Sequence, residues 1–212
     1  MKSMAGERLD HARIDSLGIE GDRVVHVEDT RGHVVTARTH PRLLAHRATL
    51  APSGEPLVDG APWTQSEVRR SVVDIVGPGA RLVRDDSASR FDVLPLLVAT
   101  DGAIAAFGYD GRRLRPNIVV GGVQGLAERS WPGHCLRVCD VVIGVPALRS
   151  RCVMTTFDPD TLAQDPKVLR RIAREFGGQL VLNCYVIRGG EIQVGDTVEA
   201  VPSRECAALQ AR

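Results

Sequence analysis

Residues 165–201, "DPKVLRRIAREFGGQLVLNCYVIRGGEIQVGDTVEAV", carry the clearest structural signal in the chain. Asp165 is a capping residue and Pro166 suits the first turn of a helix. One face of this helix is apolar and Gly177 ends it; the apolar residues are Val168, Leu169, Ile172 and Phe176. The rest of the stretch predicts two or three strands separated by glycine turns.

Short β-branched runs with turns between them occupy most of the remaining sequence. Residues 23–27 and 33–38 predict a hairpin joined by the turn-rich Glu28–Gly32 segment. Valines at every fourth position predict a helix that ends at Gly77, followed by a strand over residues 81–84. Further predicted elements are a strand over residues 94–99, a short alanine-rich helix near 103–107 and a strand over 117–120. Many short strands with few helices predict a mainly β (α+β) fold with barrel-like architecture, not a doubly wound sheet.

The polar segment "DDSASRFD", residues 85–92, is the best candidate for a domain junction. We therefore predict a smaller, N-terminal β-barrel-like domain over residues 1–88 and a second domain over residues 89–204. Residues 205–212 would form a C-terminal tail.

Composition limits the partners and the compartment of the protein. The 27 lysines and arginines nearly cancel the 26 aspartates and glutamates, so no global field favours nucleic acid or an anionic membrane. No apolar run approaches the roughly 20 residues that span a bilayer, and the N-terminus lacks a secretion signal. Five cysteines without a regular framework suit a reducing compartment in which thiols stay free. We expect a cytoplasmic protein that binds neither nucleic acid nor membrane.

Several familiar catalytic patterns are absent from the sequence. It contains no G-x-G-x-x-G or Walker loop between a strand and a helix, and "GGVQG" at residues 121–125 carries little weight. The histidines lack the helical spacing of zinc hydrolases, and no G-x-S-x-G elbow supports a serine hydrolase. These classes are unsupported.

Cys152, in "RSRCVMTTFDPDT" (residues 149–161), has an unusual neighbourhood. Arg149 and Arg151 flank it, and in an extended segment both guanidinium groups would lie opposite the thiol. Local positive charge favours the thiolate, which attacks electrophiles and binds soft metals. A free cysteine is also often a small buried apolar residue, and on composition alone that alternative is favoured. We assign this packing role to the other four cysteines, Cys135, Cys139, Cys184 and Cys206.

Two further segments are candidate anion sites. In "DGRRLRPNIVV", Pro116 would hold Arg115 extended, Asn117 begins an apolar strand, and three neighbouring arginines could grip a carboxylate or phosphate. Near the N-terminus, Lys2, Ser3 and Arg23 could hold a phosphate. A solvated loop is the competing interpretation of the first segment, and a mobile chain end that of the second.

The segments taken together resemble a known family. "GIEGDR", "VTARTHPRLL", "LRPNIVV", "SRCVMTTFDPDT" and "IQVGDTV" occur in the order seen in MOSC-domain proteins that carry an N-terminal β-barrel extension. The pattern is similar to that of the amidoxime-reducing molybdenum enzymes, and it covers nearly the whole chain. The two predicted domains would then be the N-terminal barrel (1–88) and the MOSC domain (89–204).

The resemblance implies a molybdenum cofactor, Mo-molybdopterin, whose metal takes one protein thiolate. Cys152 stands where the family places that metal ligand, so it would be the catalytic residue and the metal-binding residue. The residues that match cofactor-binding positions are Lys2, Ser3, Arg23, Asp92, Arg115, Asn117, Ser150 and Arg151. Asn117 is as readily a strand-end support, and Arg38 would orient the residues that touch the cofactor. Val93 and Leu94 depart from the family's small hydroxyl residues before the central strand.

The resemblance also implies an activity and partners. The expected function is molybdenum-dependent reduction of small N-hydroxylated compounds such as amidoximes, hydroxylamines and hydroxylated nucleobases. Because the sequence shows no second redox centre, a separate electron-transfer protein of ferredoxin or cytochrome type is required. The alternative is a carrier that uses Cys152 to transfer the cofactor or sulfur to another enzyme.

Overall fold

The computed structural model describes residues 1–202 and 204–206, which form two compact units that are not continuous in sequence. The first unit comprises Met1–Arg8, Gly21–Asp92 and Pro159–Ala163. The second comprises Leu9–Glu20, Val93–Asp158 and the chain from Gln164 onward. The chain thus passes from the first unit to the second at Asp92, the last residue of the polar segment 85–92. Of the expected C-terminal tail, residues 207–212 lie outside the described residues.

The first unit is built on two three-stranded antiparallel sheets, ordered β4-β3-β8 and β5-β6-β7. Their strands are β3 (Val25–Glu28), β4 (Val34–Val35), β5 (Ala48–Leu50), β6 (Pro56–Val58), β7 (Ala61–Pro62) and β8 (Arg81–Arg84). The predicted hairpin is confirmed in shorter form, since Val27 of β3 pairs with Val35 of β4. The strand predicted over residues 81–84 is β8, and it pairs with β3.

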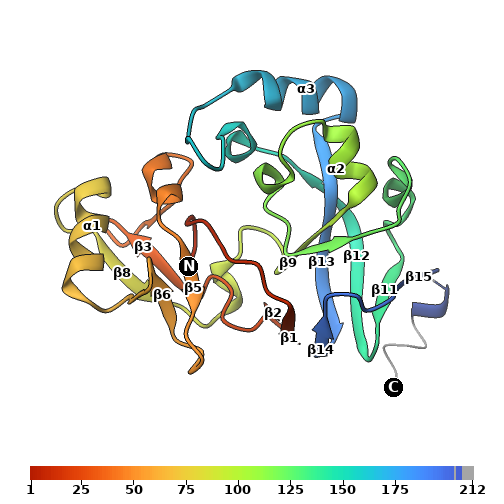
Figure 1. Ribbon diagram of the computed structural model, residues 1–212, viewed down its shortest axis with the longest axis horizontal. Helices are drawn as coiled ribbons and strands as arrows, with labels where there is room; N and C mark the ends of the chain where they lie inside the picture. The colour runs from red at the N-terminus through yellow and green to blue at the C-terminus, as the bar shows by residue number, and fades with distance from the viewer. Residues whose placement is uncertain (203, 207–212) are drawn as a thin grey trace. The chain divides into compact units, whose positions relative to one another are not determined.

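Helix α1 (Ser66–Val76) lies beside β3 and β8 in this unit (Figure 1). Val68 and Val72 are buried, as the four-residue valine spacing predicts, and Gly77 ends the helix with φ 119°. The first unit also contains two short 3-10 helices, η1 (Pro41–Ala45) and η2 (Ala88–Arg90).

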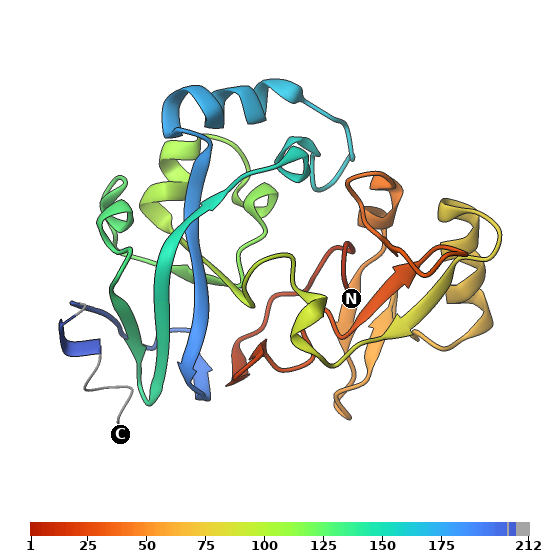
Figure 2. The ribbon, with the colours of Figure 1, turned by 180° about the vertical axis from the view of Figure 1, so that it is seen from behind.

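A six-stranded sheet ordered β10-β9-β13-β12-β11-β15 forms the body of the second unit. Its strands are β9 (Leu96–Thr100), β10 (Ile118–Val120), β11 (Cys135–Val138), β12 (Val141–Ser150), β13 (Gln179–Arg188) and β15 (Val198–Val201). A smaller sheet, β14-β1-β2, pairs β1 (His11–Asp15) with β14 (Gly190–Gln193) and with β2 (Gly18–Ile19). Register shifts between β12 and β13 accompany the curl of the large sheet (Figure 2). The prediction of a mainly β fold with short helices is confirmed.

Both faces of strand β9 are buried. Leu96 and Val98 pack into an apolar cluster that Ile14 of β1 joins, whereas Ala99 packs into a second cluster beneath the helices. The helices of this unit are α2 (Asp101–Phe107), η3 (Gly111–Leu114), η4 (Ala127–Ser130), η5 (Val153–Thr156) and α3 (Pro166–Phe176). Helices α2 and α3 together cover one face of the sheet (Figure 1).

Helix α3 has the boundaries that the sequence predicts. The Asp165 side chain accepts a hydrogen bond from the Lys167 backbone N–H at 2.9 Å, and Gly177 follows in the left-handed conformation. Val168, Ile172 and Phe176 are buried. Each contributes about 1.5–3 kcal/mol of apolar burial, so one amphipathic face fixes the helix on the sheet.

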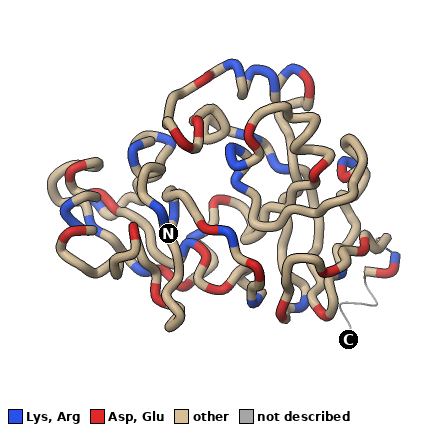
Figure 3. The backbone as a smooth tube through the Cα atoms, in the orientation of Figure 1, with Lys and Arg blue, Asp and Glu red and all other residues tan. Residues whose placement is uncertain are grey.

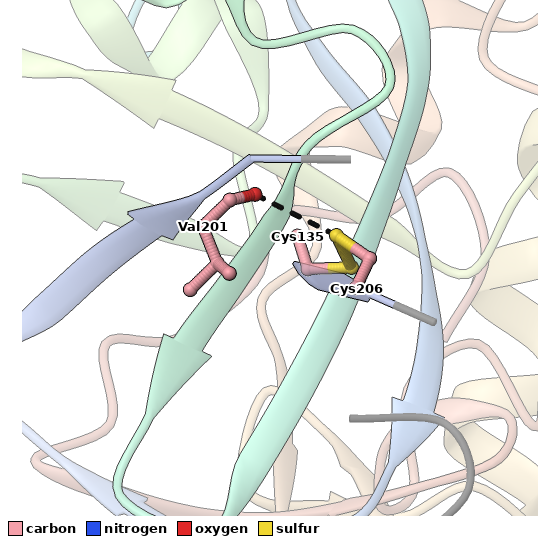
Figure 4. The surroundings of a disulfide bond; sticks show 3 residues. All are labelled: Cys135, Val201 and Cys206. Atoms are coloured by element: carbon pink, nitrogen blue, oxygen red, sulfur yellow. Dashed lines mark hydrogen bonds between the residues drawn. A yellow bond between two sulfur atoms is a disulfide. The ribbon is translucent and has the colours of Figure 1, made fainter. Parts of the chain in front are cut away.

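The cysteines differ from the sequence expectation in two ways. Cys135 of β11 and Cys206 form a disulfide beside Val201, so the expectation that these thiols are free is wrong (Figure 4). Cys139 is exposed, with a left-handed φ of 51°, because it lies in the turn between β11 and β12; a packing role for it is also wrong. Cys184 is buried as expected.

In the part of the chain that the structure describes, no helix combines the length and the apolar character needed to cross a lipid bilayer.

Candidate functional site

Cys152 lies two residues beyond the end of strand β12, in the second unit, at the start of the short helix η5. Its thiol is free and half-buried. The Thr155 backbone N–H and hydroxyl both donate to the Cys152 carbonyl oxygen, at 3.1 and 2.9 Å. The backbone of the turn is therefore fixed, and the cysteine that it carries is only partly buried.

Arg151 places a positive charge beside this thiol. Its backbone N–H donates to Gly178 O at 2.9 Å, and its Nη2 donates to Leu114 O at 2.7 Å. Its Nε is buried and has no hydrogen-bond partner. The pKa of the Arg151 guanidinium is lowered to about 10, chiefly by burial; the Cys152 charge opposes this shift, and Arg149 and Arg115 contribute to it. Arg151 is thus still cationic at neutral pH, and its Nε–H is left for an acceptor.

Strand β12 ends at Ser150, which is exposed, and the backbone of Cys152 is extended as well, with φ −132° and ψ −178°. The Cys152 charge raises the pKa of the Arg151 guanidinium, so the two groups interact electrostatically. The arginine-containing stretches at the end of β12 and in η3 lie side by side (Figure 3).

Arg115 is left-handed, with φ 53° and ψ 49°, and not extended as expected. The reason is that it caps helix η3, with its N–H donating to Arg112 O at 3.0 Å, and Pro116 disfavours the right-handed helical region at the preceding residue. The three arginines of this segment do not form one anion grip. Arg112 pairs with Asp110 and Arg113 pairs with Asp158, whereas Arg115 acts on Arg151 and lowers its pKa, with a smaller effect than that of Arg149.

Asn117 supports the end of a strand. Its backbone N–H donates to Leu97 O at 2.7 Å, and its side-chain Oδ1 accepts from Leu97 N–H at 2.9 Å. These bonds begin the parallel pairing of β10 with β9. The carboxamide oxygen of Asn117 is therefore engaged within the fold. This favours the role of strand-end support over that of cofactor contact.

A second group of predicted site residues lies together in the first unit. Asp92 accepts from Lys2 Nζ at 2.9 Å and from Arg38 Nη2, and Lys2 Nζ also donates to Arg90 O at 2.8 Å. Burial opposes ionisation of Asp92, but Lys2 and Arg38 outweigh it and lower the pKa of its carboxyl group. The guanidinium group of Arg23 lies 5.5 Å from the centre of the Phe91 ring. Two cationic side chains, Lys2 and Arg38, thus meet at the Asp92 carboxylate, and Arg23 lies over the ring of the adjacent Phe91.

Three of the predicted cofactor-binding residues have left-handed backbones: Ser3 (φ 69°), Arg23 (φ 57°) and Arg115 (φ 53°). The left-handed region is uncommon for residues other than glycine and is strained, of order 1–3 kcal/mol each. Such conformations cluster at ligand sites, because the surrounding structure must impose them. No sequence pattern predicts these conformations.

The predicted site residues fall into two groups, one in each unit. Lys2, Ser3, Arg23, Arg38 and Asp92 belong to the first unit; Arg115, Asn117, Ser150, Arg151 and Cys152 belong to the second. Sequence reasoning missed the ion pair of Arg113 with Asp158, which joins η3 to the residues after η5. The only sequence signal for this ion pair was that Arg113 and Asp158, of opposite charge, each lie in one of the two recognised motifs.

The second group fits an anionic cofactor that carries a soft metal. Cys152 supplies a free, half-buried thiol as a sulfur donor, and Arg151 supplies a buried cation whose Nε has no partner within the protein. A thiolate is a ligand that soft metals accept, and guanidinium groups bind phosphate and other oxyanions. The donor set and the local charge are therefore compatible with such a group. Among the described residues, no three histidine, cysteine, aspartate or glutamate side chains gather as metal ligands.

Two known proteins are similar in sequence to large parts of this chain. The mitochondrial amidoxime reducing component 2 of Macaca fascicularis is 25% identical over 227 residues, which cover 79% of this chain and 67% of the relative. The human mitochondrial amidoxime-reducing component 1 is 33% identical over 111 residues, which cover 50% of this chain but 31% of the relative.

Two family models match different parts of the chain. The MOSC N-terminal beta barrel domain matches residues 1–82, and the MOSC domain matches residues 102–199. The first match lies before the polar segment 85–92 and the second after it. The chain therefore belongs to the MOSC-domain proteins that carry the N-terminal MOSC β-barrel domain.

Proposed function

We propose that this protein binds a molybdenum-pterin cofactor through Cys152 and reduces N-hydroxylated compounds. The observation that carries the proposal is the free, half-buried thiol of Cys152 beside the buried guanidinium group of Arg151. The MOSC family is associated with molybdenum-cofactor binding, and two relatives are named for amidoxime reduction. Both facts support the same activity.

In the second unit, Cys152 would supply the thiolate ligand of the metal. Arg151 would donate from Nε to an acidic oxygen of the cofactor, since this nitrogen is buried and has no acceptor in the protein. Arg115 adds a second positive charge to the same region. Ser150 is exposed at the end of β12 and offers a hydroxyl group next to the ligand.

In the first unit, Lys2, Ser3 and Arg23 would bind a phosphate group. Asp92 and Arg38 would orient Lys2, because the Asp92 carboxylate binds both cationic groups. A lysine held by one carboxylate and one carbonyl oxygen loses part of its rotational freedom before any ligand arrives. Pre-ordering of this kind lowers the entropic cost of binding an anion.

When bound, the cofactor supplies the two-electron chemistry and the protein supplies binding, orientation and access. The net reaction converts an N-hydroxylated compound, two electrons and two protons into the reduced amine or amidine and water. The electrons would come from a separate electron-transfer protein of ferredoxin or cytochrome type. The natural N-hydroxylated substrate would be a small amidoxime, hydroxylamine or hydroxylated nucleobase.

The second candidate function is transfer of the cofactor or of sulfur by Cys152. The observation that favours it is the partial exposure of the thiol, because a carrier must present its cargo to another protein. A carrier binds the cofactor or a persulfide without turning over an N-hydroxylated substrate.

The deciding experiment measures molybdenum and activity in the same preparations. The protein is made in cells that synthesise the pterin, as wild type, as Cys152→Ser and as Cys139→Ser, the exposed free thiol serving as the matched control. We expect one molybdenum per chain and benzamidoxime reduction with reduced methyl viologen in wild type and Cys139→Ser, and loss of both in Cys152→Ser. Molybdenum without reduction would favour the cofactor carrier. A wild-type protein free of molybdenum would overturn both the reductase and the cofactor carrier, and would leave sulfur transfer as the remaining candidate.

A further inference from the structure

Helix η3 (Gly111–Leu114) and the turn that carries Cys152 are held together by two arginines that reach in opposite directions. From η3, Arg113 donates through Nη1 to Thr156 O at 2.9 Å and through Nη2 to Asp158 Oδ2 at 2.8 Å. From the Cys152 side, Arg151 donates through Nη2 to Leu114 O at 2.7 Å. Each arginine thus binds the backbone of the segment that the other comes from.

The Arg113 end of this arrangement is well shielded from water. The Arg113 side chain is 9% exposed and that of Asp158 is 30% exposed, and Thr156 is buried. A guanidinium group that donates to two acceptors in such a setting binds them more strongly than it would bind a partner in an exposed ion pair, because water competes less for its N–H groups. Arg112, the neighbour of Arg113, is 57% exposed and pairs with Asp110, two residues before it in the sequence.

The bridge connects the two sequence motifs that supply the candidate site. Arg113 lies two residues before Arg115, and Asp158 lies six residues after Cys152. The backbone between Arg113 and Arg115 is a tight turn ending in a left-handed residue, and the backbone of Cys152 is bonded to Thr155. Both intervening segments are short and internally bonded, so fixing their ends restricts where the guanidinium group of Arg115 and the sulfur of Cys152 can lie.

We propose that Arg113 and Asp158 are positioning residues that hold the Cys152 turn against η3 and so set the geometry of the cofactor-binding thiol. The Arg113 guanidinium group acts through the Thr156 carbonyl and the Asp158 carboxylate, and it does not itself touch the cofactor. The description of Cys152 as a metal ligand rests on the proposed function, whereas the effect of the bridge on the thiol does not. The two ideas are therefore tested separately.

The first test uses cofactor-free protein and measures the alkylation of individual cysteines by iodoacetamide, followed by peptide mass spectrometry. In Arg113→Met we expect Cys152 to react roughly fivefold faster than in wild type, because the turn that carries it is released. A change of this size lies within the range of coupling between residues in contact. Cys139, at the opposite end of β12, serves as the internal reference and should keep its rate. Arg112→Met is the matched control and should leave both rates unchanged.

Two further variants distinguish positioning from general stability. Arg113→Lys keeps the charge but loses the planar fork, so it should restore part of the wild-type Cys152 rate. Asp158→Asn removes the charged acceptor, and its effect should not add to that of Arg113→Met, because both changes break the same bridge. If Arg113→Met does not fold, Arg113→Lys and Asp158→Asn decide the question on their own.

The second test measures molybdenum retained after gel filtration of protein made with the cofactor. We expect Arg113→Met and Asp158→Asn to hold the metal about tenfold less tightly than Arg112→Met, as for other residues that orient a ligand. A folded Arg113→Met protein with a Cys152 alkylation rate within about twofold of wild type would overturn the proposal. So would a rate increase that Cys139 shares. Loss of molybdenum from every variant, including wild type, would instead contradict the proposed function and leave the alkylation result standing.

Discussion

Glu128, in helix η4 of the second unit, has a fully buried carboxyl group. Its Oε2 accepts from the Thr100 hydroxyl at 3.3 Å, whereas its Oε1 has no hydrogen-bond partner. The adjacent Arg129 directs its guanidinium group to the carbonyl oxygens of Gln179 and Phe176 instead. Burial therefore dominates and raises the pKa of Glu128.

This pKa shift predicts a pH-dependent stability. Because the folded state binds the Glu128 proton more tightly than the unfolded chain, the stabilisation is complete below about pH 4.5 and is lost as pH rises through the folded pKa. Glu128→Gln cannot ionise, so its free energy of unfolding relative to wild type should increase by about 1 kcal/mol between about pH 4 and pH 8. Urea unfolding at several pH values measures this difference. Exposed Glu191→Gln is the control, and a parallel pH dependence of Glu128→Gln and wild type would contradict the prediction.

Single residues also show what sequence patterns can and cannot predict. Cys152 could be recognised because its motif is distinctive, and the structure places a free thiol there. The left-handed backbone of Arg115 could not be predicted from Pro116 alone, because the cap of η3 determines it. The bridge from Arg113 to Asp158 joins residues 45 positions apart, and only the folded backbone brings them together.

At the scale of elements, helix α2 contains a glycine that cannot be exchanged for a better helix former. Alanine in a helix is usually about 1 kcal/mol more favourable than glycine. At Gly102, however, a Cβ atom would lie 2.2 Å from Val123 O and 2.4 Å from Gly125 O. These oxygens belong to the loop "GGVQG", residues 121–125, which carried little weight as a sequence motif. The backbone N–H groups of Gly122 and Val123 donate to the Asp101 carboxylate and hold the loop against the start of α2.

We therefore predict that Gly102→Ala is destabilising in spite of helix propensity. Both nearby atoms are backbone oxygens of a loop that is hydrogen-bonded to the helix, so they cannot move away independently. Overpacking of this kind typically lowers the free energy of unfolding by about 1–3 kcal/mol, which exceeds the gain in helix propensity. Thermal unfolding should show a lower Tm for Gly102→Ala than for wild type. An unchanged or higher Tm would show that the loop yields.

The N-terminus of α3 offers a second prediction at this scale. The Asp165 carboxylate caps the helix through the Lys167 N–H, and the Asp165 N–H itself donates to Thr156 O at 2.9 Å. Asp165→Ala should lower the free energy of unfolding by about 1 kcal/mol, the usual value of a cap. Asp165→Asn is the matched control, because asparagine caps nearly as well. Chemical denaturation measures both, and equal losses in the two variants would mean that charge, not capping, is responsible.

Elements that depend on local patterns were predictable, and those that depend on distant pairing were not. Helices α1 and α3 and strand β8 are recognised by valine spacing, a capping residue and glycine stops that all lie within a few residues. Strand β1, in contrast, pairs with β14, so His11 lies opposite Gln193. No local pattern specifies that register, which is fixed when Ile14 joins the apolar cluster of the second unit.

At the scale of the whole molecule, the chain visits each unit more than once. The segment Leu9–Glu20 belongs to the second unit although residues on both sides belong to the first, and Pro159–Ala163 shows the converse. Composition and turn signals locate the passage at residues 85–92, but they cannot show such excursions, because these depend on contacts between distant segments. The same limit applies to the site, whose residues were recognised by motif and whose grouping required the folded units.

The disulfide between Cys135 and Cys206 gives a prediction for the stability of the second unit. It joins residues separated by 71 positions, and cross-linking a long loop restricts the unfolded chain, which typically stabilises the folded state by roughly 2–4 kcal/mol. Cys206→Ser should therefore lower the free energy of unfolding by this amount, and excess dithiothreitol should lower the Tm of wild type but not of Cys206→Ser. Cys139→Ser, which removes an unpaired exposed thiol, is the control. If dithiothreitol leaves the wild-type Tm unchanged, or if mass spectrometry finds both thiols free in the purified protein, the bond does not contribute to stability in solution and the original expectation of free cysteines holds.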